Sequence, residues 1–351
     1  MNVFGGGLSP CYSLSPMKIK AVKPAITLPG GTVRVELEGL QNPSEVRVEV
    51  GDVAAEIAGA SSRALTVRIP ERCGNGLVIH NQGDQRMDLK VGRVIASELH
   101  PVANPVVDSM GNVYVTVSGT RGEKVPFSVF VVYADGSKHP FLADVVNPTG
   151  LAIGLDDCLY ITSRHTGTVY RATFDKQIEK YVDGRGLATG LVFDSQKNLL
   201  VGDRNGKIYK VSPKQEISVL CTLEPSVSAY HLAVAPDDTL FVTGPTLATQ
   251  DSIYRVSRDG QVEVYFKGLG RPQGLGFDPQ GKLQVTASWQ GRKGLYTFNN
   301  GTPELTVSGP MLVGFVYDNS RNFLYLVDSA NLFRIELGDH RPQTTDHKPA
   351  G

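Results

Sequence analysis

Basic and aromatic side chains recur at one kind of position in this 351-residue chain, directly after a short run of alternating apolar residues. Arg164 and Arg204 stand at two of these positions, and Trp289, the single tryptophan, stands at a third. A guanidinium group presents a rigid fork of donors that matches a carboxylate or phosphate, and an indole face attracts cations and planar groups. These residue types predict a binding site for a planar or anionic molecule.

A second set of polar residues stands at the start of such runs, and we expect both sets to share one surface. The predicted ligand-binding residues are Thr149, Arg164, His165, Thr189, Asp203, Arg204, Tyr230, His231, Gln273, Trp289 and Arg292. Structural alternatives stay open for this set. The Thr and Gln side chains can bind loop backbone, and His231 can be a buried structural histidine. Asp203 and Arg204 can form a local ion pair, and Trp289 can serve packing.

Catalytic and metal-binding constellations have no support in the sequence. Ser163 and His165 stand too close on one loop to act as nucleophile and base. The four cysteines, at positions 11, 73, 158 and 221, form no Cys-x-x-Cys or Cys/His pattern. Cys158 fits a small core residue. We therefore predict no catalytic residue, no metal ion and no cofactor.

The segments that carry these residues repeat six times with a period of about 42 residues. The same apolar position falls at Val113, Leu159, Leu199, Leu240, Leu283 and Leu324. The intervals between them are 46, 40, 41, 43 and 41 residues. A fixed period in this range is typical of a repeat architecture, in which each unit buries its apolar faces against the next copy.

Within each repeat the apolar pattern has period 2, which indicates strands, and Gly, Asp and Asn turns separate about four of them. Four-stranded units repeated radially predict a six-bladed β-propeller. We name the strands of each blade A to D. Strand C carries an aromatic in every repeat, which we assign to packing between blades: Phe130, Tyr170, Tyr209, Tyr254, Tyr296 and Phe333. The A–B turns carry Asp as a turn former.

The last repeat ends after strand C, at Leu337, so one blade lacks a strand. Residues 92–98 precede the first repeat, and we predict that they fill this gap and close the ring. In a propeller blade the D–A connections and the B–C loops lie on the same face. We call this face the mouth, and we expect the predicted ligand-binding residues to line it.

Composition narrows the partners and the location. Lysine plus arginine and aspartate plus glutamate number 35 each, so the formal charge is zero and nucleic-acid binding is disfavoured. The sequence contains no run of 18 apolar residues, so no segment is apolar enough over that length to span a membrane as a helix. The N-terminus lacks the pattern of a secretory signal, which favours a cytoplasmic location with an extracytoplasmic one as the alternative. We expect residues 1–17 to be a disordered extension and residues 339–351 a polar tail.

The pattern of residues 18–91 predicts a separate small β-domain, because apolar and polar residues alternate strictly at 32–37, 46–50 and 65–69. The stretch PGGTVRVELEGL, a following V-x-V-G-D hairpin and the alternating strand before Ile-Pro-Glu resemble the IPT/TIG family. The resemblance implies an immunoglobulin-like sandwich used for domain stacking and protein contacts. It implies no catalysis.

Residues 92–338 resemble NHL-type and gluconolactonase-type (senescence marker protein) six-bladed propellers, through PTGLAIGLDDCLYITSRHTGTVYR and RPQGLGFDPQGKLQVTAS. The two parts together resemble bacterial proteins described as gluconolactonase-like. Lactonases of that group hold a divalent metal with Glu, Asn and Asp on the channel axis. The matching positions of this chain are Ala103, Thr149, Thr189, the Ala229–Leu232 turn and Gln273. None supplies the expected ligand, so the resemblance does not transfer a metal site.

Two functions remain from the sequence. The first is an all-β binding or scaffold protein, whose rigid propeller presents a loop-built mouth to a small molecule or a protein. The second is a divergent gluconolactonase-like hydrolase that lacks the usual metal ligands. The absence of a catalytic constellation from the sequence favours the first function.

Overall fold

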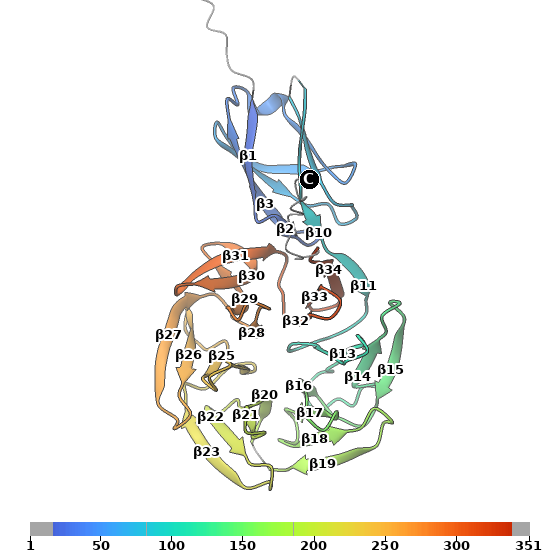
Figure 1. The fold of residues 1–351 in the computed structure, drawn as a ribbon, viewed down its shortest axis with the longest axis vertical. Coiled ribbons are helices and arrows are strands. Elements are labelled where there is room, and N and C mark those ends of the chain that lie inside the picture. The colour runs from blue at the N-terminus through green and yellow to red at the C-terminus, as the bar shows by residue number, and fades with distance from the viewer. Residues whose placement is uncertain (1–16, 82, 185, 339–351) are drawn as a thin grey trace, which may run out of the picture. The chain divides into compact units, whose positions relative to one another are not determined.

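The structure is a computed structural model that describes residues 17–81, 83–184 and 186–338 (Figure 1). The predicted tail and all but Met17 of the predicted N-terminal extension lie outside these residues. The chain divides into two compact units between Val91 and Gly92. The only helix in the described ranges is the 3-10 turn η1 (Pro43–Glu45). No helix among the described residues could therefore span a membrane.

The first unit contains two four-stranded antiparallel sheets. One has the order β1 (Lys18–Lys23), β3 (Thr32–Glu38), β7 (Ala64–Arg68), β6 (Glu56–Ser61). The other has the order β5 (Val53–Ala54), β4 (Arg47–Val50), β8 (Leu77–His80), β9 (Asp84–Met87). A short parallel pair joins β2 (Ile26–Thr27) and β10 (Lys90–Val91).

Both sheets contribute to one hydrophobic core, which explains the period-2 pattern of their strands. Val33, Val35 and Leu37 alternate with exposed or half-buried residues along β3 and point into this core. Val48 on β4 and Ile79 on β8 join it from the other sheet. The three strands predicted from alternation are all present.

The second unit is a ring of four-stranded antiparallel sheets that matches the predicted six-bladed propeller (Figure 1). Blade 1 has β12 (Val106–Val107), β13 (Val113–Thr116), β14 (Val129–Val132) and β15 (Lys138–Leu142). Blade 2 has β16 (Pro148–Ile153), β17 (Leu159–Ser163), β18 (Val169–Ala172) and β19 (Ile178–Val182). Blade 3 has β20 (Ala188–Phe193), β21 (Leu199–Asp203), β22 (Lys207–Val211) and β23 (Ile217–Thr222).

The remaining blades follow the same order from strand A to strand D. Blade 4 has β24 (His231–Val234), β25 (Leu240–Thr243), β26 (Asp251–Val256) and β27 (Val262–Leu269). Blade 5 has β28 (Leu275–Phe277), β29 (Leu283–Trp289), β30 (Arg292–Asn299) and β31 (Thr302–Ser308). Blade 6 has β32 (Gly314–Asp318), β33 (Phe323–Val327) and β34 (Leu332–Glu336), completed by β11 (Arg93–Ala96).

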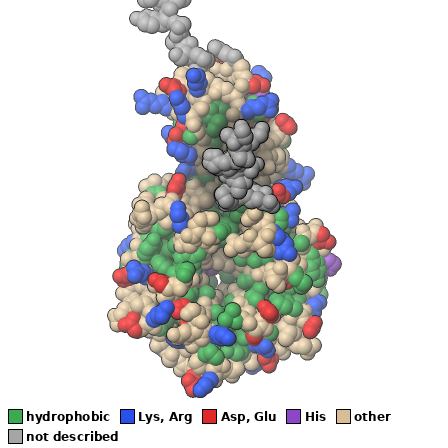
Figure 2. Space-filling model, in the orientation of Figure 1, with side chains coloured by type: hydrophobic (Ala, Val, Ile, Leu, Met, Phe, Trp, Pro, Cys, Tyr) green, Lys and Arg blue, Asp and Glu red, His purple; other side chains and the backbone are tan. Residues whose placement is uncertain are grey.

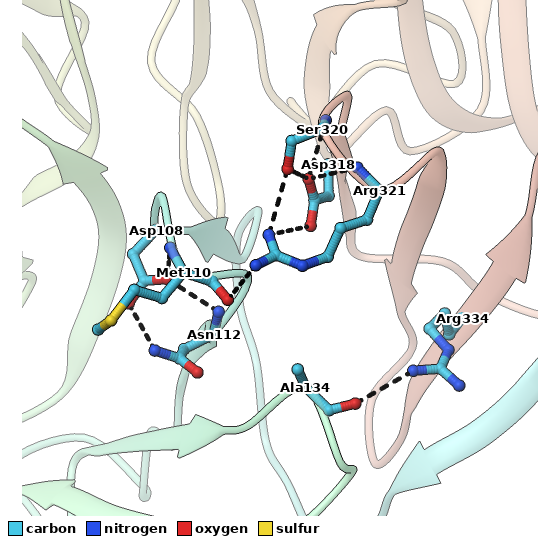
Figure 3. Close-up of polar contacts among 8 residues, drawn as sticks. All are labelled: Asp108, Met110, Asn112, Ala134, Asp318, Ser320, Arg321 and Arg334. Carbon is cyan, nitrogen blue, oxygen red and sulfur yellow. Dashed lines mark hydrogen bonds and ion pairs between the residues drawn. The ribbon is translucent and has the colours of Figure 1, made fainter.

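The predicted closure of the ring is confirmed. Strand β11 pairs antiparallel with β34, with Arg93 opposite Arg334 and Val94 opposite Phe333. Polar contacts also join blades 6 and 1 (Figure 3). Arg321 is held by Asp318 at 3.2 Å and donates to the Met110 carbonyl, and Arg334 donates to the Ala134 carbonyl at 3.4 Å. The strand that precedes blade 1 thus covers the open edge of blade 6.

Hydrophobic clusters between neighbouring blades hold the ring together. Leu159 and Val129 belong to one cluster of blades 1 and 2, and Leu199 and Val169 to the next. The strand C aromatics take part in these clusters or are themselves buried, as predicted. Lys and Arg are interspersed with Asp and Glu around the ring face in Figure 2, and neither sign forms one large patch.

Two backbone features recur around the ring and position side chains. In the A–B turns, carboxylates such as Asp194 accept backbone N–H bonds from residues two and four positions later, which confirms their role as turn formers. In strand D a β-bulge leaves one residue unpaired: Phe141, Tyr181, Leu220, Tyr265 or Thr306 in blades 1 to 5. A bulge redirects its side chain, and here it does so beside the next blade.

Candidate functional site

The mouth is built from the ends of strands A and B, which lie together in each blade. Pro148 pairs with Ser163 in blade 2, and Ala188 pairs with Asp203 in blade 3. The backbone N–H of Arg164 donates to the Asn147 carbonyl at 3.2 Å, and the N–H of Arg204 donates to the Leu187 carbonyl at 3.1 Å. The B–C loops therefore lie against the D–A connections, as the strand order predicts.

Thr149, Thr189 and Tyr230 occupy the inner ends of strands A, but their polar atoms bond within the fold. Both threonine side chains are fully buried, and Tyr230 is 1% exposed. Thr189 donates to the Gly202 carbonyl at 3.1 Å and accepts from the backbone N–H of Tyr230 at 3.1 Å. The Tyr230 hydroxyl donates to the Glu224 carbonyl. These contacts agree with the alternative interpretation, in which these side chains brace backbone between blades.

His231 stands in a slot that holds glycine in other blades. A Cβ at Gly190 would lie 2.4 Å from the Tyr230 carbonyl oxygen, and one at Gly274 would lie 2.5 Å from Gly314 Cα. Glycine is needed there because neighbouring inner strands approach closely. His231 is 4% exposed, and burial lowers its pKa to about 4. It is therefore a neutral imidazole at pH 7.

Asp203 is 3% exposed and acts as a loop brace. Its carboxylate accepts from the backbone N–H groups of Leu187 and Asn205, both at 3.0 Å. The contacts among the described residues do not include the local ion pair with Arg204 that the sequence left open. The Arg204 guanidinium instead donates to the Ser226 carbonyl at 3.2 Å.

Arg164 and Arg204 are the two charged groups that the structure brings together at the mouth. Arg164 is half-buried and donates to Ser118 Oγ at 3.3 Å and to the Gly119 carbonyl at 3.5 Å. Neither guanidinium pairs with a carboxylate of the described ranges. Burial lowers the pKa of Arg164, and the positive charge of Arg204 lowers it further. Two half-buried cations on neighbouring B–C loops thus act on each other electrostatically, with no counterion for either among the described residues.

Trp289 and Arg292 flank the tight B–C hairpin of blade 5, where they pair with each other. The half-buried Trp289 ring packs edge-to-face on Tyr296, with ring centroids 6.2 Å apart. The Tyr296 hydroxyl donates to the carbonyls of Trp289 at 3.1 Å and Arg292 at 2.7 Å. Packing therefore uses one side of the indole. Blade 5 stands three blades from Arg164, so these two residues belong to another sector of the ring.

The other two predicted residues differ in exposure. Gln273 is half-buried at the start of blade 5, where its backbone N–H donates to the Thr286 carbonyl at 2.8 Å. His165 is exposed on the B–C loop of blade 2. Neither side chain makes a hydrogen bond or ion pair with another described residue.

Sequence reasoning missed Asn147, which anchors the long B–C loop of blade 1. Its side chain accepts from the Gly122 N–H at 2.7 Å and donates to the carbonyls of Gly119 and Thr120 at 3.0 and 2.8 Å. It is fully buried with a left-handed backbone, φ 47°. The Asn-Pro pair before strand A was the available signal. Asn147 thereby fixes the carbonyl that Arg164 contacts.

A divalent cation does not fit the axial positions. Ala103 has no ligand atom, and the Thr189 hydroxyl is already bonded on both sides. The described residues include no group of three or more His, Cys, Asp or Glu able to hold a metal. A hard cation needs several oxygen ligands including carboxylates. The gluconolactonase-type metal chemistry therefore has no set of ligands here.

No sequence family matches this chain, and no curated protein is similar to it. Solved structures are similar. A gluconolactonase from Xanthomonas campestris matches 70% of this chain and 90% of its own, with a TM-score of 0.58 at 16% identity. An auxiliary nutrient binding protein from Bacteroides thetaiotaomicron matches 92% of this chain and 98% of its own, with a TM-score of 0.53 at 13% identity. A catalytically inactive virginiamycin B lyase from Staphylococcus aureus matches 88% of this chain and 100% of its own, with a TM-score of 0.50 at 14% identity.

At these identities the similarity shows the fold, a six-bladed propeller like those of the gluconolactonase and lyase structures. The extents of the matches differ. Residues 92–351 are about three quarters of the chain, so a match over 92% extends into both compact units. The gluconolactonase match, at 70%, is no longer than the propeller unit alone.

Proposed function

We propose that this protein binds a small molecule with an anionic group at its propeller mouth and does not transform it. One observation carries the proposal: Arg164 and Arg204 are two half-buried cations on neighbouring B–C loops, and neither has a carboxylate partner in the described part of the chain. Such an arrangement is unfavourable by itself, because like charges repel more strongly when they leave water. A bound carboxylate or phosphate would neutralise both guanidinium groups and accept their paired donors.

The loop contacts support a prepared site. Ser118, Gly119 and Ser226 hold the guanidinium groups through bonds that leave further N–H donors unused. Asn147 locks the blade 1 loop that supplies two of these partners. Binding to side chains that are already ordered costs less conformational entropy.

The similar structures support a small ligand. Those similar over almost the whole chain include two auxiliary nutrient binding proteins, from Bacteroides thetaiotaomicron and Bacteroides ovatus. Their description fits a propeller that captures a small molecule without changing it.

A lactonase-like hydrolase is the second candidate, and its support is the fold shared with the gluconolactonases. The mouth provides no matching machinery. Ser163 is fully buried and donates to the Val146 carbonyl at 2.6 Å, so it is not presented as a nucleophile. The proposal therefore favours binding over catalysis.

We further propose that residues 18–91 are an immunoglobulin-like domain of the IPT/TIG type and that residues 92–338 are the propeller domain. The two antiparallel sheets and shared core of the first unit support the former assignment. On this view the first domain makes protein contacts, and the propeller binds the small molecule.

The test is a thermal-shift and calorimetry screen of the full chain with sugar acids, nucleotides and neutral lactones. An anionic compound should bind, and Arg204→Gln should weaken it about tenfold or more, the loss of about 1–3 kcal/mol expected for a charge-assisted bond. Arg255→Gln is the matched control, because Arg255 pairs with Glu263 on the outside of blade 4. Anion binding that survives Arg204→Gln would contradict the proposal. Turnover of a lactone, followed by NMR, would favour the hydrolase instead.

A further inference from the structure

Neighbouring blades form a repeated groove on the face opposite the mouth, and three positions build each groove. One is on strand B, one is the bulged residue of strand D, and one is at the end of the next blade's strand A. Between blades 2 and 3 these are Tyr160, Tyr181 and Phe193, which we call the 2/3 groove. Between blades 4 and 5 they are Phe241, Tyr265 and Phe277, the 4/5 groove.

The two grooves have the same aromatic geometry. Tyr160 meets Tyr181 and Phe193 edge-to-face, with centroids 5.0 and 4.9 Å away and interplanar angles of 90° and 80°. The corresponding distances from Phe241 are 5.2 Å to Tyr265 and 5.8 Å to Phe277, at 88° and 76°.

A side chain of the protein fills two of the grooves. In the 4/5 groove, Phe298 packs on Tyr265 with centroids 5.5 Å apart. Between blades 1 and 2, Phe174 packs on Tyr114 and Phe141 with centroids 5.4 and 6.4 Å apart. The fold thus has two positions from which a ring can close a groove.

The 2/3 groove has no such ring and contains a cavity of about 410 Å³. Val211 stands where blade 5 has Phe298, since each follows the strand C aromatic by two residues. Pro213 stands where blade 2 has Phe174, in a turn of the same hydrogen-bond pattern. Pro213 lines the cavity without filling it. The volume lies in the range of small-molecule sites.

Polar groups surround this aromatic wall, and their charges cancel. Arg171 pairs with Asp156 at 2.7 Å and Glu179 at 2.9 Å. The Tyr160 hydroxyl donates to Asp156 at 3.0 Å. Lys197 also lines the cavity. With two cations and two carboxylates, the site has no net charge to attract an ion.

The A–B turn of blade 2 departs from the repeat at this site. Gly154 takes the position that Asp194 and Asp278 hold in other blades. A Cβ there would lie 2.5 Å from Asp156 Oδ1 and 2.7 Å from Tyr160 Cε2. Because position 154 is a glycine, the Asp156 carboxylate has room to bond to Tyr160 and Arg171 at the cavity wall.

We infer that the 2/3 groove binds a neutral saccharide of one or two rings. Aromatic faces attract the C–H groups on the apolar side of a sugar ring, because the π-face is electron-rich. Carboxylates, guanidinium and the Gln215 amide then match hydroxyls around its edge. An anionic ligand gains nothing from a wall of zero net charge. A purely apolar ligand would leave the polar groups unmatched.

The neighbouring groove of blades 3 and 4 shows why the aromatic wall matters. Its cavity is smaller, about 240 Å³, and is lined by Leu200 and Leu220 where the 2/3 groove has Tyr160 and Tyr181. Arg258 stands at the closing position there and pairs with Asp238 at 3.0 Å. That groove offers no aromatic face to a sugar ring.

The experiment is calorimetric titration of the full chain with glucose, galactose, mannose and disaccharides built from them. At least one should bind. Pro213→Phe, which places a ring where Phe174 fills its own groove, should weaken binding tenfold or more while the chain stays folded by circular dichroism. Tyr181→Ala should do the same by removing a wall. Tyr265→Ala, the matched change in the filled 4/5 groove, should leave affinity unchanged.

Three results would overturn the inference. The first is no binding by any sugar in the panel. The second is binding that both Pro213→Phe and Tyr181→Ala leave intact. The third is binding of a charged sugar acid in preference to its neutral parent, combined with loss of binding on Arg204→Gln, which would place the sugar at the mouth. Since the mouth and this groove lie on opposite faces, failure here leaves the proposed function untouched.

Discussion

The 2/3 and 4/5 grooves share three aromatic positions and nearly the same ring geometry, yet one is open and the other is filled. The difference lies in one strand C position, Val211 in blade 3 and Phe298 in blade 5. The wall is common to both grooves because the bulge in strand D recurs with the fold. The closing side chain is free to vary. A repeat protein can therefore make a cavity in one blade without disturbing the others.

The contrast has an energetic side. Phe298 is 4% exposed, so its ring contributes to the stability of blade 5 by removing apolar area from water. The 2/3 groove forgoes that contribution and keeps charged groups at its edge. A protein selected for stability alone would fill it, and this supports a functional role for the open groove.

Removing the ring that fills the 4/5 groove should give the largest loss of stability. Phe298→Ala should lower the free energy of unfolding by about 3–5 kcal/mol, the usual cost of removing a buried Phe. Urea denaturation is the measurement. Arg255 takes the position of Arg171 in the 4/5 groove and pairs with Glu263 at 3.1 Å, but Phe241 has no hydroxyl where Tyr160 donates to Asp156. We therefore expect the variant to gain no saccharide binding. A loss under about 1 kcal/mol would mean that Phe298 does not fill this groove.

Exchanging the turn residue should give a smaller effect. Phe174→Pro copies the turn of blade 3 into blade 2 and removes a half-buried ring from Tyr114 and Phe141. We expect a loss of about 1–3 kcal/mol by thermal or urea unfolding, because Pro is compatible with this turn and the cost is mainly lost packing. Phe127→Ala, an exposed aromatic on a loop of the same unit, is the control. If Phe174→Pro is as stable as the native chain, the Phe174 ring does not fill the groove between blades 1 and 2.

The smallest effect should be that of pH on saccharide affinity at the open 2/3 groove. Burial acts to raise the pKa of Asp156, but bonds from Arg171 and Tyr160 outweigh it and hold the pKa below its usual value. A carboxylate with a lowered folded-state pKa keeps its contribution above the unfolded pKa, about 3.9, and loses it as pH falls through the folded value. Saccharide affinity, followed by titration, should therefore stay level from about pH 5 to 8. A decline near pH 6 would show that another group controls the site.

The mouth shows how far side-chain type can predict a site. The sequence points to Arg164, Arg204 and Trp289 because neither tight turns nor strand packing requires them, and the two arginines do lack carboxylate partners in the described ranges. Thr189 and Tyr230 were grouped with them by position alone. In the structure their polar side-chain atoms instead form hydrogen bonds with backbone groups of blade 3 and of the segment that leads into blade 4.

The sequence by itself determined the blade count, the strand order within each blade and the closing strand. These follow from local signals: alternation along a strand, Asp-rich turns and a missing strand after Leu337. Only the tertiary structure decided which side chains stay available. Asp203 turns to backbone N–H groups and leaves Arg204 without a counterion, and Pro213 leaves a cavity where Phe174 fills one. Such outcomes depend on how each loop folds and how neighbouring blades pack, which no alternation or turn pattern records.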